Sequence, residues 1–212
     1  MSTRQKIHKL REEIDKGKEQ DFEKIVSFIL KALKEYKNNS MSWDGLYPEV
    51  ENLFFESFGH TYTTTREGLA KIYKAVKEFS IEDVRDLTYH VDGKNIEERL
   101  KEYWNESKKR LDNKENPEDV KTYLINKYDR ILNTETRVIE SRIKNYRKPL
   151  NAEMLIIEHS SGCPDCPGGE YAADENVDLP PFHPNCQCCY YYVVTDDEDD
   201  INDLDLEVDD LA

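Results

Sequence analysis

The stretch Cys163-Pro-Asp-Cys166, followed by His183-Pro-Asn-Cys186-Gln-Cys188-Cys189, decides how the C-terminal part of this chain folds. Two residues between a pair of ligands allow a tight turn to direct both side chains at one ion, and Cys and His are ligands of structural zinc. The residues between the two halves are rich in Pro, Gly and acidic side chains, so they cannot hold a conformation by burying apolar surface. The sequence therefore predicts one structural zinc ion.

Five residues compete for the four positions of a tetrahedral zinc site. Cys186 could pair with His183 on one side or with the cysteines that follow it on the other, so the second half of the site is ambiguous. We favour His183 with either Cys186 or Cys188, because a strand that begins near Cys188 would point alternate side chains to opposite faces. Cys189 is then the spare thiol, and His159 could make an outer contact. The candidate ligands are Cys163, Cys166, His183, Cys186 and Cys188.

Catalytic uses of these cysteines fit the sequence less well. A Cys-Pro-x-Cys pair also occurs in thiol oxidoreductases, but a reactive thiolate is usually stabilised at a helix N-terminus, and Cys166 is followed by Pro-Gly-Gly. Catalytic zinc needs an open position, which a site closed by Cys and His ligands does not offer. A metal-dependent hydrolase or nuclease would also need a general base, and none is placed to serve. We expect a protein that is not an enzyme.

Short β-type runs flank the cysteine segment, and a long helical pattern precedes it. Residues 154–157 and 190–194 are rich in β-branched or aromatic side chains, which predicts two strands around a metal-stabilised loop. Before them, apolar residues recur at helical spacing from residue 120 to residue 143. Asn116-Pro117 is a typical helix start, with Pro at the first helical position. We expect this helix to end before Pro149.

The N-terminal half also has helical spacing. Residues 3–38 predict two helices or one bent helix with a weak point at Gly17, and apolar positions in 46–58 and 96–111 predict two more. Another helix is expected after Thr64, because Thr64 and Glu67 form a capping-box pattern. This helix would bury Leu69, Ile72, Val76 and Phe79.

These patterns predict a mainly α fold in three parts. Residues 1–115 would form a helical N-terminal region, and residues 116–194 a C-terminal region with a small zinc-stabilised β-hairpin. Residues 196–212 contain ten acidic and no basic residues, so we expect residues 195–212 to form a disordered acidic tail. The spaced apolar residues of this tail could dock on a basic partner or mimic the charge of DNA.

Composition narrows the function classes. The 212 residues are 37% hydrophobic and 35% charged, and no run of eighteen apolar residues is present, so we expect a soluble intracellular protein without a membrane partner. The net charge of −15 includes the ten negative charges of 196–212, which leaves −5 for the residues before them. A body with so small a net charge could carry a basic patch, for instance around Lys144, Arg147 and Lys148. Five cysteines crowded near one end fit metal ligation in a reducing compartment better than disulfides.

Three sequence elements together resemble the phage Mu F-like head morphogenesis family of minor head proteins. The elements are, in order, Thr134-Glu135-Thr136, Cys163-Pro-x-Cys166 and Pro180-Pro-x-His183-Pro-Asn-Cys186-x-Cys188. The resemblance covers roughly residues 123–192. Thr134 and Glu135 match the family's Thr-Glu element, and the five candidate ligands match its knuckles. The chain departs from the family at Gln187, where Arg is frequent, and at 157–159, where the family has Trp and Asp.

The resemblance implies a non-catalytic virion or procapsid protein that binds the portal protein, the major capsid protein or both. Such a protein assists head morphogenesis, can influence DNA packaging or delivery, and would be found in the phage head and, during assembly, in the host cytoplasm. Independently of the resemblance, Thr134 could cap a helical turn. Glu135 could accept hydrogen bonds from the knuckle backbone or from Arg137 or Arg142. The alternative function is an intracellular zinc-knuckle adaptor that recruits a partner through its acidic tail.

Overall fold

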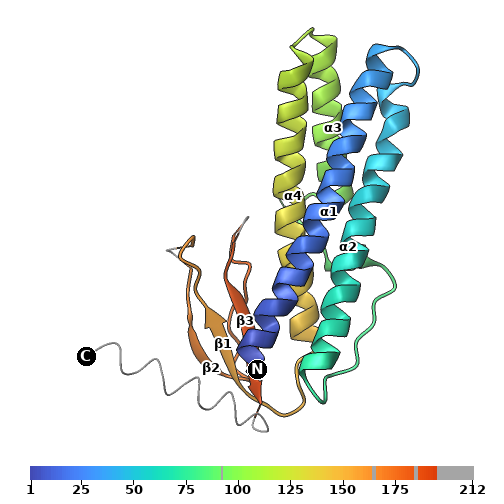
Figure 1. The fold of residues 1–212 in the computed structure, drawn as a ribbon. Helices are drawn as coiled ribbons and strands as arrows, with labels where there is room; N and C mark the ends of the chain where they lie inside the picture. Colours follow the sequence, from blue (N-terminus) through green and yellow to red (C-terminus); the bar gives the residue numbers. More distant parts are fainter. Residues whose placement is uncertain (92, 164–165, 184–185, 195–212) are drawn as a thin grey trace.

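The computed structural model describes residues 1–91, 93–163, 166–183 and 186–194, and in this part of the chain four α-helices form an elongated bundle. A small antiparallel sheet packs against one end of the bundle (Figure 1). The mainly helical prediction is confirmed, whereas the predicted tail at 195–212 lies outside the described residues. The helices are α1 (Thr3–Lys37), α2 (Trp43–Ile72), α3 (Ile96–Asp112) and α4 (Pro117–Tyr146), with a short 3-10 helix η1 (Val84–Leu87). The strands are β1 (Ala152–Glu158), β2 (Gly169–Ala172) and β3 (Cys189–Val194).

Each α-helix begins where a polar side chain caps its first turn. These side chains accept hydrogen bonds from backbone N–H groups that have no partner within the helix. The predicted start of α4 is confirmed, with Asn116 as the cap and Pro117 in the first position. α1 is one helix that passes through Gly17, so of the two expectations for residues 3–38 the single helix is the one observed. The four caps are Ser2, Ser42, Asn95 and Asn116.

Two tryptophans join the start of α2 to the middle of α3. The rings of Trp43 and Trp104 stack with centroids 4.2 Å apart, and each indole N–H donates to the backbone carbonyl of the other residue, at 2.9 and 3.0 Å. Both side chains are fully buried. On α4, the ring of Tyr128 packs edge-on against Phe54 of α2. The predicted boundary between residues 115 and 116 falls in the loop before α4, and a single hydrophobic core includes residues from both sides of it.

The sheet has the order β2-β1-β3, with both neighbours of β1 antiparallel to it. The two predicted strands are confirmed as parts of β1 and β3, whereas β2 was not predicted because its Gly-Glu-Tyr-Ala sequence lies in a segment rich in turn-forming residues. Tyr190 of β3 donates its hydroxyl to the carbonyl of Ser141 on α4. The hydroxyl of Tyr73 lies 3.1 Å from both the amide nitrogen and the carbonyl oxygen of Tyr192. These bonds hold β3 against the helical body.

The prediction that a new helix begins after Thr64 is wrong, because α2 continues through this position and ends at Ile72. The hydroxyl of Thr65 donates to the carbonyl of Thr61 one turn earlier, so this threonine is accommodated in the helix interior. Leu69 is buried on α2 as expected. Val76 and Phe79 instead lie in the irregular segment after α2, where Val76 pairs with Pro149 and the Phe79 ring stacks on Tyr146.

The suggestion of a basic patch around Lys144, Arg147 and Lys148 is also wrong, because these residues are largely buried. Lys144 and Arg147 are only 3% and 5% exposed, and Lys148 is half-buried with its ammonium group on the carbonyl of Ala173. Lys144 and Lys148 make internal contacts, so these three cations do not form an exposed basic patch. Among the described residues, none of the helices has the length and apolar character needed to cross a membrane.

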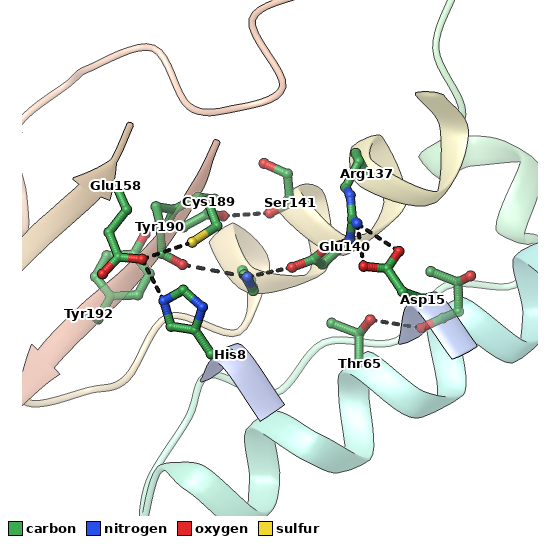
Figure 2. A network of polar contacts seen from close by, with 12 residues as sticks. His8, Asp15, Thr65, Arg137, Glu140, Ser141, Glu158, Cys189, Tyr190 and Tyr192 are labelled. Atoms are coloured by element: carbon green, nitrogen blue, oxygen red, sulfur yellow. Dashed lines mark hydrogen bonds and ion pairs between the residues drawn. The ribbon is translucent and has the colours of Figure 1, made fainter. Parts of the chain in front are cut away.

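A buried ionic network connects α1, α4 and β3 (Figure 2). Arg137 of α4 donates to both carboxylate oxygens of Asp15 on α1 at 2.6 Å, and to Glu140 at 2.9 Å. Lys144 donates to the other oxygen of Glu140 at 2.6 Å and to the carbonyl of Tyr190 at 3.5 Å. Burial alone would raise the pKa of Glu140, but Lys144 and Arg137 outweigh burial and hold it well below its usual range. The network therefore keeps Glu140 ionised inside the protein.

We expect this network to make the protein sensitive to acid. The folded-state pKa of Glu140 lies below the unfolded value of 4.5, so its contribution to stability is present above pH 4.5 and decreases as pH falls from there towards the folded pKa. Urea unfolding of the wild type and of Glu140→Gln from pH 7 to pH 3 should give a difference in unfolding free energy that is constant above pH 5 or so. Below that, the difference should shrink by about 1.4 kcal/mol per pH unit.

The cysteines and His183 near the sheet are unchanged in Glu140→Gln, so their own acid sensitivity cancels in the difference. A difference that stays constant down to pH 3 would contradict an ionised Glu140.

Candidate metal centre

Four of the five predicted ligands lie together in the connections of the sheet. Cys163 and Cys166 belong to the β1–β2 connection, and His183 and Cys186 to the β2–β3 connection. Their ligand atoms all lie within 4.8 Å of one another. The three cysteines are buried and His183 is exposed at the edge of the group. These four residues could hold a metal ion.

Two similar turns bring the four side chains together. The N–H of Cys166 donates to the carbonyl of Cys163 at 3.0 Å, and the N–H of Cys186 donates to the carbonyl of His183 at 3.1 Å. The two end residues of each pair are thus joined by a backbone hydrogen bond, as expected for ligands separated by two residues. The Sγ atoms of Cys166 and Cys186, one from each turn, are 3.9 Å apart.

Cys188 packs beside these four residues, in one buried group with the other three cysteines. Its Sγ accepts a hydrogen bond from the N–H of Ser160 at 3.4 Å, much as Cys163 Sγ accepts one from the N–H of Gln187 at 3.3 Å. Backbone donors of this kind stabilise a thiolate over a thiol. Cys188 therefore remains an alternative ligand to the exposed His183.

The crowded thiols have divergent acidities. The N–H of Gln187 lowers the pKa of Cys163 to about 7, against the opposing effect of burial. Burial and the neighbouring Cys186 and Cys188 raise the pKa of Cys166 to about 12. Several thiolates cannot coexist in so small a volume unless a cation compensates their charge, and the arrangement is therefore suited to a metal ion.

Two further residues take the positions that the sequence suggested. The Nε2–H of His159 donates to the carbonyl of Cys163 at 2.5 Å, which makes His159 an outer contact of the first turn. Cys189 lies outside the four-residue group, and its thiol donates to Glu158 at 3.3 Å. Burial raises the pKa of Cys189 to about 11. Because Cys188 and Cys189 are adjacent at the start of β3, their side chains point to opposite faces.

Thr134 and Glu135 are buried on α4, but with other partners than predicted. Glu135 accepts a hydrogen bond from Arg99 of α3 at 2.5 Å and one from the N–H of Tyr89 at 2.7 Å. Within the described part of the chain, neither Arg137 nor the backbone around the candidate ligands donates to it. Arg142 acts on Glu135 only through its charge. The Thr134 hydroxyl donates to the carbonyl of Arg130 within α4, so it is not a cap. Glu135 thus anchors the loop before α3.

Sequence reasoning missed a second group of potential ligands, His8, Glu158 and Cys189. They come from three elements and share no spacing, so only the three-dimensional structure brings them together.

No protein-family model matches this chain, and neither curated proteins nor solved structures gave a match. A function must therefore be inferred from the residues of the chain itself.

Proposed function

We propose that the Cys/His cluster binds one Zn²⁺ that stabilises the fold. The 3.9 Å between the sulfurs of Cys166 and Cys186 supports this ion. Two sulfurs bound to one tetrahedral Zn²⁺ at about 2.3 Å would lie roughly 3.8 Å apart. Four Cys and His ligands fill the tetrahedron and leave no position for a reacting water, so the ion's role is structural. The ligand pairs lie on either side of β2, so one ion would fix both connections of the sheet.

We further propose that the protein is a non-catalytic minor head protein of a phage, which binds the portal protein or the major capsid protein during head assembly. The observation that carries this proposal is the ordered set of three motif elements, each with a structural role in the described chain. Thr134-Glu135 is buried against the loop before α3, and the two ligand turns close around one point. The elements are thus parts of one scaffold, as expected if their order reflects a common architecture.

The shape of the molecule also suits an assembly role. Two long helices, α1 and α2, project away from the sheet, and α3 and α4 run beside them (Figure 1). The zinc site is at the sheet, so the ion can keep the sheet rigid while the far end of the bundle meets a partner. Binding through such a surface needs no reacting group. We propose the phage head as the place of action, with the host cytoplasm before assembly is complete.

Co-expression with the portal protein of the same genome tests the proposal. We expect the two proteins to co-elute on size exclusion, and the protein to be present at low copy number in purified virions. A form truncated after residue 194 is the matched control, because the adaptor alternative places partner binding in the acidic tail. Loss of portal binding on truncation would favour the adaptor, and absence from both the portal complex and the virion would reject the head-protein proposal.

A further inference from the structure

A second group of metal-ligating side chains lies where α1 meets the sheet. It consists of His8 on α1, Glu158 at the end of β1 and Cys189 at the start of β3, and we call it the junction cluster. One atom of each residue lies within 4.8 Å of those of the other two. Glu158 Oε2 is 2.6 Å from His8 Nε2 and 3.3 Å from Cys189 Sγ (Figure 2). Three different donor types thus converge on one point from three elements.

We propose that the junction cluster is a second binding site for a zinc-type divalent cation, with three protein ligands and one open coordination position. Imidazole nitrogen, carboxylate oxygen and thiolate sulfur are all ligands of Zn²⁺. Cys189 is buried and His8 is about half exposed, so an ion can enter from the solvent side. This inference uses none of the ligands proposed for the Cys/His cluster, and it does not depend on the proposed function.

Arg4 orients the carboxylate of this site. Its Nε lies 2.5 Å from Oε1 of Glu158, which leaves Oε2 to face His8 and Cys189. Contacts of this kind to the second oxygen of a ligating carboxylate fix its direction. A bound cation would displace the proton of the Cys189 thiol, and the thiolate and the Glu158 carboxylate would then supply two negative charges to a divalent ion.

Only a small movement separates the observed positions from a coordination shell. Ligand atoms at about 2.0 to 2.3 Å from a tetrahedral ion lie roughly 3.3 to 3.8 Å apart. The separation of Cys189 Sγ from Glu158 Oε2 is already 3.3 Å. His8 is closer to Glu158 and must move outward by less than about 1 Å, which its exposed side chain allows.

An ion at the junction cluster would fasten the first turns of α1 to the ends of β1 and β3. Water, or a donor atom from another molecule, would fill the fourth position on the side of His8. A site with three protein ligands binds more weakly than a closed site of four. We therefore expect the junction cluster to bind its ion only after the Cys/His cluster is occupied.

Equilibrium dialysis of the full chain against Zn²⁺, with metal analysis of the retained protein, tests the site. We expect the wild type to bind one equivalent tightly and a second at higher free Zn²⁺. His8→Ala and Cys189→Ser should each weaken the second equivalent at least about tenfold, because loss of an outer-shell contact alone costs that much. His60→Ala is the matched control, since His60 is another exposed histidine, paired with Asp21 at 2.8 Å. Neither of the two groups of potential ligands among the described residues includes it.

Co²⁺ provides an independent readout. The second equivalent of Co²⁺ should add a thiolate-to-metal absorption band that is absent in Cys189→Ser and unchanged in His60→Ala. Retention of the first equivalent shows that a variant is folded. A wild type that takes up only one equivalent, or a second equivalent that survives both His8→Ala and Cys189→Ser, would overturn the proposal.

Discussion

Replacing Cys163 and Cys166 together by serine is expected to remove the tightly bound zinc and to lower the melting temperature. Both side chains lie in one turn of the cluster, so the double variant loses half of the ligands. The segment between β1 and β3 has few apolar residues to replace the ion. Structural zinc sites bind with apparent free energies of about 10 to 16 kcal/mol, so even partial coupling to global unfolding should lower the melting temperature by roughly 10 °C.

Metal analysis of protein purified without added zinc and differential scanning calorimetry measure the two effects. Cys189→Ser is the matched control, because Cys189 is a buried cysteine of the same strand region but outside the four-residue group. It should keep the tight equivalent and most of the melting temperature. A metal-free wild type, or a double variant that melts with the wild type, would reject the structural zinc.

The same measurement resolves the choice between His183 and Cys188. The carbonyl of His183 accepts a hydrogen bond from the N–H of Cys186, but His183 is exposed. Cys188 is buried, and its Sγ accepts a hydrogen bond from the N–H of Ser160. Whichever of His183→Ala and Cys188→Ser releases the tight equivalent identifies the fourth ligand. The spacing of residues could not decide this point, because Cys186 has potential partners on both sides.

The sequence predicted best those elements that carry their own local signals. Asn116 and Pro117 start a long amphipathic pattern, and α4 begins there. β1 and β3 were recognised by β-branched and aromatic runs, which suit a pleated surface wherever they occur. The strand β2 has only four residues and is stabilised by its pairing with β1. Its formation depends on tertiary contacts that local propensity does not contain.

The errors share one physical cause, which is that long-range packing overrides a local signal. Thr64 and Glu67 have the pattern of a helix start, but α2, which packs against α1 and α4, continues past them with Thr65 and Leu69 buried. Glu135 finds its partner on α3, 36 residues earlier in the chain, and no spacing rule connects it to Arg99. Lys144 has the sequence context of a surface cation and is buried because Glu140 is buried with it.

Replacing Glu140 by alanine is the second large effect that we expect. It leaves Lys144 buried without the carboxylate that neutralises it, and Arg137 keeps only its ion pair with Asp15. Removing one member of a buried ionic group typically costs about 3 to 5 kcal/mol. For a chain of this size that corresponds to a fall of roughly 6 to 20 °C in melting temperature. Glu102→Ala is the control, because Glu102 pairs with Lys94 at the surface and its loss should cost about 1 kcal/mol or less.

A compensated variant separates the loss of the carboxylate from the loss of packing. Arg137→Met, Glu140→Leu and Lys144→Met together remove the buried charges while keeping most of the side-chain volume. If unpaired charge is the cause, this triple variant should melt well above Glu140→Ala, since apolar replacement of a buried ionic group is often neutral or stabilising. Asp15 then loses its partner Arg137, but it is about one-third exposed and can be hydrated. Equal melting of the single and triple variants would show that the network contributes mainly through packing between α4 and the sheet.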